Sequence, residues 1–226
     1  GGSMNSLTDL DIYKKATKKT QNALLENGCT VKIKKGEHLF NIRDKVNVVY
    51  LIISGYAVLS RDSDEHGVRN IFLLGEGSLL NEVILDGVSA SISCLALSDL
   101  TVIGYPRSDM LGIMKADFSF NRYVINSMAL KIRKLYHMLE ISTKSTHLDH
   151  QTASRIWKFA RDFGIKRDGY VQIPFELRIT LLAGFMGSNR ETISRIVKQL
   201  SEAGILSIEK GECRIYDLDK LKNYGR

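Results

Sequence analysis

The sequence predicts an α+β fold: an antiparallel, jelly-roll-like β-roll, then a long helix, then a C-terminal winged helix-turn-helix. Three observations support this prediction. Short β-rich runs alternate with glycine turns up to about residue 105, a heptad pattern follows from about residue 120, and two short amphipathic stretches precede a hairpin pattern near the C-terminus. We expect helices and the β-roll over residues 5–119, the long helix over 120–141, a hinge over 142–151, and the winged helix-turn-helix over 152–226.

Composition limits the classes of protein to consider. The 226 residues suffice for two modest domains, and the net charge of +7 comes mainly from residues after Ser142. No apolar run is long enough to span a membrane, and the N-terminus lacks the apolar core of a signal peptide, so we expect a cytoplasmic protein. The five histidines are scattered, and no nucleophile–base pair or phosphate loop is recognisable. We therefore predict no catalytic residues, no metal site and no enzymatic activity.

The N-terminal half reads as short helices followed by strands. Residues 5–27 are polar and rich in lysine, which favours one or two short helices before the strands begin near Cys29. Glycine turns such as Lys35–Glu37 and Gly75–Gly77 separate the β-rich runs, a density typical of a small antiparallel barrel or jelly roll. The expected strands are Thr30–Ile33, Val48–Ile53, Ala57–Ser60, Ile71–Leu74, Ile92–Leu97 and Leu100–Gly104.

The long helix has an apolar row that calls for a partner helix. Its members are spaced 3, 4, 3, 4, which is the a/d pattern of a coiled coil, and they are Ile125, Met128, Ile132, Leu135 and Leu139. We therefore expect a homodimer. Val124, Leu130 and Tyr136 lie off this row and are expected to pack on the β-roll of the same chain.

The C-terminal part contains two short helices joined by a tight turn. A first helix over Thr152–Phe163 and a strand over Tyr170–Ile173 lead to this pair. Gly187 suits the left-handed turn between the two helices, and Ser188 or Asn189 is expected to cap the second. The paired helices have apolar positions at helical spacing: Ile179, Leu182, Ala183 and Met186, then Ile193, Ile196, Val197 and Leu200. Ile205–Ile208 and Cys213–Tyr216 then read as a hairpin, the wing.

The second helix of the pair begins with side chains suited to base edges. Arginine can bind guanine through two donors, and glutamate can accept from cytosine, so we predict guanine or phosphate contacts for Arg190 and Arg195 and a cytosine contact for Glu191. Backbone or secondary contacts are predicted for Ser188, Asn189, Thr192 and Ser194. The alternative is a plain helical hairpin whose charges form surface pairs four residues apart.

Two stretches resemble the Crp/Fnr family of bacterial transcription regulators. Ser188–Arg195 is similar to the recognition-helix signature of that family, and Lys34–Tyr105, with its turns, is similar to its cyclic-nucleotide-binding β-roll. The resemblance implies a homodimer that binds double-stranded DNA at an inverted repeat, a sensor function for the β-roll, and RNA polymerase as a further partner.

The residues at the family's ligand loop argue against a cyclic nucleotide. Glu82 and Ser91 match the family's ribose and phosphate ligands, but Asn81 replaces a glycine and Ala90 replaces the arginine that binds the phosphate. In the same alignment, Met138 and Leu139 stand where cyclic-AMP binders present hydroxyls to adenine. The candidate effector pocket thus comprises Asn81, Glu82, Ala90, Ser91, Met138 and Leu139, with its ligand unknown.

The three cysteines leave two alternatives to an effector-gated regulator. Cys29, Cys94 and Cys213 are far apart, and Cys29 alone stands in the N-terminal part where some family members hold an iron–sulfur cluster, so we expect no cluster. One alternative is a constitutive DNA-binding regulator with a vestigial sensor. The other is a redox sensor based on a cysteine thiol.

Overall fold

A computed structural model describes residues 6–63, 67–142 and 147–225. Contacts divide the chain into two compact units, Gly1–Arg61 with Phe72–Ser142 and Asp62–Ile71 with Thr143–Arg226. Within the described ranges, no helix is both long and apolar enough to cross a membrane. Residues 143–146 of the predicted hinge lie outside the described residues. Helix α5 (Leu148–Phe163) starts four residues before the predicted position, so residues 148–151 are helical and not part of a hinge.

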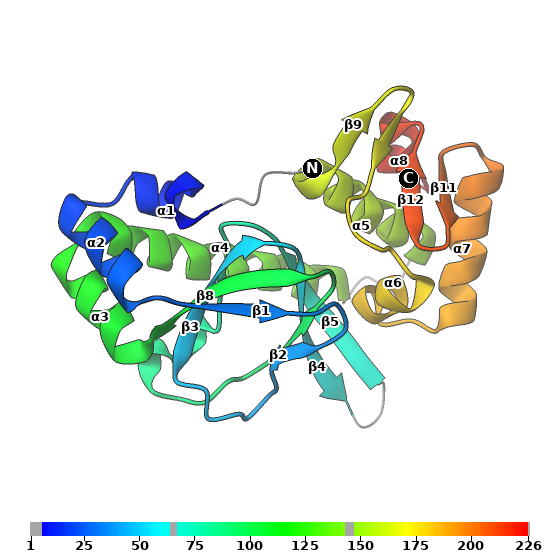
Figure 1. The fold of residues 1–226 in the computed structure, drawn as a ribbon. Coiled ribbons are helices and arrows are strands. Elements are labelled where there is room, and N and C mark those ends of the chain that lie inside the picture. Colours follow the sequence, from blue (N-terminus) through cyan, green and yellow to red (C-terminus); the bar gives the residue numbers. More distant parts are fainter. Residues whose placement is uncertain (1–5, 64–66, 143–146, 226) are drawn as a thin grey trace. The chain divides into compact units, whose positions relative to one another are not determined.

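The β-roll consists of two four-stranded sheets, whose strands belong to the first unit except for the end of β4 and the start of β5 (Figure 1). One sheet has the strand order β1-β8-β3-β6 and the other β2-β7-β4-β5. Pairing is antiparallel within the first sheet and on both sides of β7 in the second, as the strand pattern predicted. The strands are β1 (Cys29–Ile33), β2 (His38–Phe40), β3 (Val48–Ser54), β4 (Ala57–Ser63), β5 (Gly67–Leu74), β6 (Leu79–Leu80), β7 (Ser93–Ala96) and β8 (Leu100–Pro106).

Helices from both ends of this unit cover one side of the first sheet. The core between them contains Leu51 of β3, Tyr105 of β8 and Phe120 of the long helix, all almost fully buried. The hydroxyl of Tyr105 donates to the carbonyl oxygen of Leu24 at 2.9 Å, which satisfies the one polar atom of this buried ring. The helices are η1 (Leu7–Asp9), α1 (Asp11–Lys14), α2 (Lys18–Asn27), η2 (Glu82–Asp86), α3 (Arg107–Ala116) and α4 (Phe118–Ser142).

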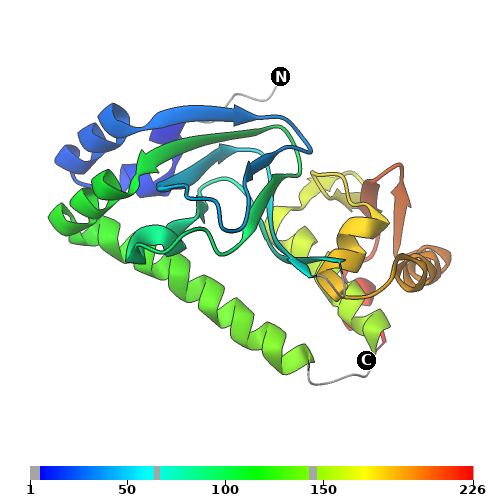
Figure 2. The same ribbon diagram turned by 90° about the horizontal axis from the view of Figure 1, so that it is seen from below.

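Helix α4 is the predicted long helix, and Figure 2 shows it as one continuous rod. Most of the predicted a/d row is uncovered in the single chain, with Ile125 51%, Ile132 46%, Leu135 39% and Leu139 65% exposed. Met128 is the exception, because it packs against the core of its own unit. Val124 is fully buried, as expected, but Leu130 and Tyr136 are 52% and 68% exposed. The prediction that these last two pack on the β-roll was therefore wrong, because both lie roughly 120° around the helix from the buried Val124 and so face away from their own unit.

The second unit has a helical core against a small sheet of order β11-β12-β10-β9. Phe159 of α5 meets Phe175 and Phe185 edge-on, with ring centroids 5.8 and 5.3 Å apart. Trp157 of the same helix is only half buried and lies under the cations of Arg161 and Lys222. The remaining elements are β9 (Ile165–Arg167), β10 (Tyr170–Gln172), α6 (Ile179–Met186), α7 (Arg190–Glu202), β11 (Leu206–Glu209), β12 (Glu212–Ile215) and α8 (Leu218–Asn223).

Candidate nucleic-acid interface and sensor loop

The turn between α6 and α7 has the predicted geometry. Gly187 ends α6 in the left-handed conformation, with φ 60° and ψ 37°, and its N–H donates to the carbonyl of Ala183. Asn189 is the residue that caps α7, because its side-chain oxygen accepts the N–H of Thr192 at 2.8 Å. Ser188 instead donates its backbone N–H to Ala183 at 3.2 Å. Two of the predicted contact residues thus build the turn itself.

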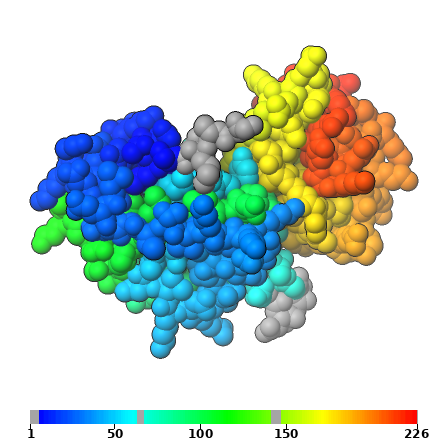
Figure 3. Space-filling model, viewed as in Figure 1, coloured from blue at the N-terminus to red at the C-terminus, as the bar shows by residue number. Residues whose placement is uncertain are grey.

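Helix α7 has one buried and one exposed face. Ile193, Ile196, Val197 and Leu200 are buried, which fixes the rotation of the helix about its axis. The opposite face presents Arg190, Glu191, Ser194 and Arg195, all exposed, while Thr192 is half buried. In the space-filling view this helix forms part of the surface of its unit (Figure 3). The sequence therefore predicted correctly which side chains face outward.

The charged groups of the first turns are not engaged with one another. Among the described residues no ion pair joins Glu191 to Arg190 or Arg195, and the ion pair that α7 does form, Lys198–Glu202 at 3.9 Å, lies nearer its C-terminal end. The alternative of a helical hairpin with surface pairs four residues apart thus loses its support at these positions. The two guanidinium groups and the carboxylate remain available to base edges or phosphates.

The wing follows as predicted, with a tight turn at its tip. Lys210 and Gly211 both have positive φ, at 50° and 84°, as a two-residue hairpin turn requires. The carbonyl of Gly211 accepts the N–H of Leu177 at 2.8 Å, so the tip of the wing is tied to the segment just before α6. Lys210 is exposed there and brings a positive charge to the same module. Cations placed in this way suit contact with a phosphate backbone.

In the first unit, the ligand loop begins at a buried asparagine. Asn81 has φ 65° and ψ 16°, a left-handed conformation that glycine adopts freely and asparagine tolerates better than other residues. This explains how Asn81 can stand where the family has glycine. Its amide nitrogen donates to the carbonyl of Val48 at 3.0 Å, while its side-chain oxygen is buried without a hydrogen-bond partner among the described residues.

Glu82 has partners within its own chain. It is only 2% exposed, and its carboxylate forms an ion pair with Lys131 of α4 and accepts the hydroxyl of Ser127 at 3.3 Å. Sequence reasoning missed Lys131 and Ser127, although their spacing of four residues places them on one face of α4.

The other residues predicted for this pocket are arranged less favourably for a phosphate ligand. Ala90 is 3% exposed and its carbonyl accepts the N–H of Arg43 at 2.8 Å, whereas Ser91 is exposed. Met138 is half buried and Leu139 is exposed, and they follow Lys131 by seven and eight residues, roughly 10 Å of helix. No grouping of three or more possible metal ligands occurs in the described parts of the chain.

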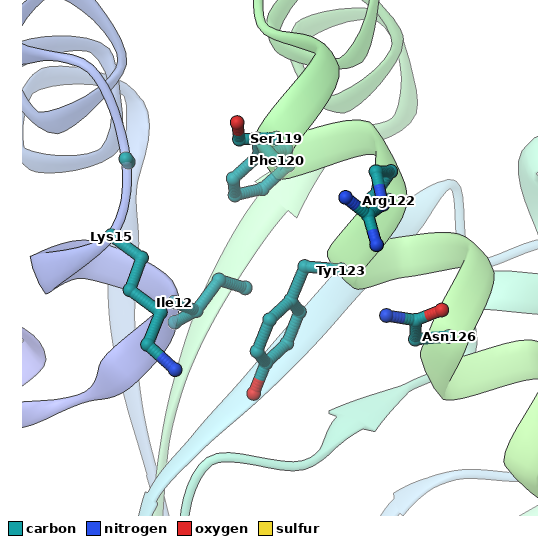
Figure 4. Close-up of a pocket in the computed structure, with 8 residues that line it drawn as sticks. Ile12, Lys15, Ser119, Phe120, Arg122, Tyr123 and Asn126 are labelled. Carbon is teal, nitrogen blue, oxygen red and sulfur yellow. The ribbon is translucent and has the colours of Figure 1, made fainter.

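A separate hollow of about 370 Å³ lies between α1 and the start of α4 (Figure 4). Lys15 and Arg122 contribute cations to its rim, and the ring of Tyr123 lies along one wall. It is distinct from the predicted effector residues. Its lining is Ile12, Lys15, Ala16, Ser119, Phe120, Arg122, Tyr123 and Asn126.

Two of the three cysteines are poorly placed for redox chemistry. Burial raises the pKa of the Cys94 thiol to about 12 and that of the Cys213 thiol to about 12, so neither forms the reactive thiolate at neutral pH. Cys29 is exposed at the start of β1. A redox mechanism would therefore depend on Cys29.

The geometry of the second unit defines a class: DNA-binding proteins with a winged helix-turn-helix. Comparison with models of known protein families identifies the family within this class. Residues 30–117 match the cyclic nucleotide-binding domain, and residues 150–224 match the Crp-like helix-turn-helix domain. The chain belongs to the Crp/Fnr family of transcription regulators, which are not enzymes.

Known relatives span most of the chain. It is 28% identical over 182 residues to the "Cyclic AMP receptor protein" of Thermus thermophilus, covering 80% of this chain and 81% of that one. It is 26% identical over 185 residues to the "HTH-type transcriptional regulator ArcR" of Staphylococcus epidermidis, covering 76% and 75%.

Solved structures share the fold at lower identity. A CooA mutant from Carboxydothermus hydrogenoformans superposes with a TM-score of 0.76 at 17% identity, covering 100% of this chain and 97% of that one. FixK2 from Bradyrhizobium japonicum gives a TM-score of 0.74 at 18% identity, covering 87% and 96%.

Proposed function

We propose that this Crp/Fnr regulator binds an inverted-repeat operator as a homodimer through helix α7. The observation that carries the proposal is the outer face of α7, where Arg190, Glu191 and Arg195 are exposed and unpaired among the described residues while the opposite face is buried. The twofold arrangement is supported by the uncovered apolar row of α4, because such a row needs a partner helix. RNA polymerase is the further partner that family membership suggests.

The β-roll is proposed to sense a signal other than a cyclic nucleotide. A buried phosphate needs a charged, hydrogen-bonding partner, and the buried Ala90 supplies none at the position of the family's arginine. The carboxylate of Glu82, which would bind the ribose, is already paired with Lys131. Because the Lys131–Glu82 ion pair occupies this carboxylate without any ligand, it also favours the second candidate, a regulator that binds DNA without an effector.

The proposal is tested by selecting bound sequences from a random duplex pool at fixed salt, with and without metabolites from a cell extract. Enrichment of an inverted repeat only with the extract would identify an effector-gated regulator, and enrichment without it would identify the effector-independent form. Failure to enrich any sequence in either condition would contradict the assignment of α7 as the recognition helix.

A further inference from the structure

Three side chains on one face of α4 hold the segment that leads into the ligand loop. Tyr123, Ser127 and Lys131 follow one another at intervals of four residues, so they lie on the same side of the helix. All three bond to residues between Gly77 and Glu82, which comprise β6 and its flanking turns. The contacts thus form a line along the helix.

The individual bonds are specific. The hydroxyl of Tyr123, seen in Figure 4, donates to the carbonyl of Gly77 at 2.8 Å. The ammonium of Lys131 donates to the carbonyl of Leu79 at 2.8 Å and forms the ion pair with Glu82, whose carboxylate also accepts from Ser127. We call Tyr123, Ser127, Lys131 and Glu82 the α4 latch.

Burial separates this latch from ordinary surface pairs. The side chains of Lys131 and Glu82 are 15% and 3% exposed, whereas those of Lys198 and Glu202 on α7 are 76% and 67% exposed. A surface pair contributes little because water screens it, but removing one partner of a buried pair leaves a charge without compensation. Lys131 therefore contributes to holding α4 on the β-roll, together with the buried Phe120 and Val124.

Within the α4 latch, Lys131 binds the carboxylate of Glu82, the residue at the position that holds the ligand's ribose in the family. In a protein of this family that needs an effector, the ligand must favour one arrangement of the loop and the helix by binding it better than the other. Here Lys131 makes the contact to Glu82 from within the chain, and α4 also carries the apolar row proposed to pair the protomers. We propose that the α4 latch replaces the effector, so that the effector-free protein is the DNA-binding form. This inference rests on the proposed operator-binding homodimer, and any signal would then act by opening the latch and lowering operator affinity.

The test measures operator affinity by fluorescence anisotropy at fixed salt, using the 226-residue chain after it has been unfolded in urea and refolded to remove small molecules. The effector-free protein should bind the selected operator. Lys131→Met and Glu82→Gln should each weaken binding by about tenfold or more, within the usual range of coupling between sites. Arg133→Met is the matched control: it removes one positive charge from an exposed position of α4 and should leave affinity unchanged.

A double variant separates the latch from simple loss of folding. Lys131→Met combined with Glu82→Met removes both charges, and such apolar replacements of a buried pair usually preserve stability. The double variant should keep the melting temperature and the dimeric state yet still lose about tenfold in affinity. Wild-type affinity in this folded double variant would overturn the latch. So would a monomeric double variant, because the effect would then belong to the dimer interface.

The outcomes also separate the latch from the proposed function. If the refolded protein binds the operator only after metabolites are added, the latch proposal fails while the proposed function stands. If neither the wild type nor Arg133→Met prefers any sequence with or without metabolites, the proposed function itself fails.

Discussion

Arg195 lies on the exposed face of α7 one turn beyond Glu191, and nothing in the described chain pairs with it. We predict that Arg195→Ala flattens base preference at one position of each half-site, at a cost of about 1–3 kcal/mol of discrimination, because a bidentate contact to guanine is lost. A panel of operators with single base changes measures this directly. Lys198→Ala, an exposed change one turn further on, is the control and should leave the base preferences intact. Equal weakening on every operator would make Arg195 a phosphate contact only.

Asp117 joins the starts of two helices in the first unit. One carboxylate oxygen accepts the N–H of Phe120 at 3.1 Å and so caps α4, while the other accepts the N–H and hydroxyl of Thr17, the cap of α2, at 3.1 and 3.0 Å. Burial by itself raises the pKa of Asp117, but the hydrogen bonds from Thr20, Phe120 and Thr17 outweigh it and lower the pKa to about 2. The ionised form is therefore stabilised in the folded state.

The sign of the resulting pH dependence follows from this depressed pKa. Relative to an ordinary value near 3.8, a pKa of about 2 contributes about 2 kcal/mol that is present above about pH 5 and lost as the pH falls toward 2. Asp117→Asn should lower the free energy of unfolding by about that amount at pH 7, and the difference from wild type should shrink on acidification. Urea denaturation across this pH range measures both effects. The exposed Asp219→Asn should show neither change.

At the scale of elements, regular periodicity decided what could be predicted. Helix α7 was predicted correctly because four buried positions repeat at helical spacing, and β3 because its apolar run is long. Strands β2 and β6 contain three and two residues, too few for any pattern to emerge, and they form only through pairing with distant strands. Helix α3 did have a signal that we did not use: Pro106 before its first residue and Asp109 in its first turn.

The candidate sites likewise divide into one that follows from local sequence and one that depends on contacts between distant residues. The residues proposed to contact DNA lie on one helix or in the turn just before it, so the sequence alone places them close together. The latch joins residues 49 positions apart, and only the folded chain brings Lys131 to Glu82. Likewise, the exposure of Leu130 and Tyr136 depends on which side of α4 packs on the β-roll, and that side is set by contacts with distant strands.

The apolar row of α4 allows a test of the element as a dimer interface. Ile132 is 46% exposed in the single chain, so Ile132→Glu should not disturb the protomer. In a paired helix it would bury a carboxylate facing its own twofold copy, and we expect the dimer dissociation constant to rise more than about tenfold. Sedimentation velocity over a dilution series measures the change. Leu130→Glu, a comparable substitution off the row, should remain dimeric, and a dimer unaffected by both substitutions would place the interface elsewhere.

At the scale of the whole molecule, the β-roll and the winged helix-turn-helix differ in how far their residues depart from the family pattern. The winged helix-turn-helix has a capped helix α7 with one buried face, and the charges on its other face, which is proposed to contact DNA, are exposed. The sensor loop retains Glu82 but engages it internally, and the buried Ala90 offers no charge at the phosphate position. The molecule thus combines a winged helix-turn-helix with a ligand loop whose Glu82 is already paired with Lys131 of helix α4.

A homodimer with two winged helix-turn-helix units constrains the spacing of the half-sites in its operator. Two recognition helices related by a twofold axis enter successive major grooves on one side of the duplex, so the half-site centres should lie about 10 base pairs apart. Inserting about 5 base pairs between the half-sites rotates one of them by half a helical turn to the opposite side of the DNA, and only one protomer can then bind specifically. We expect gel-shift affinity to fall at least about tenfold toward that of a single half-site, because the second specific contact surface is lost.

The same insertion placed outside the repeat keeps the half-sites in phase and should leave affinity unchanged. Equal binding to the two duplexes would mean that the chain binds its site as a monomer, which would contradict the role of α4 as the dimer interface.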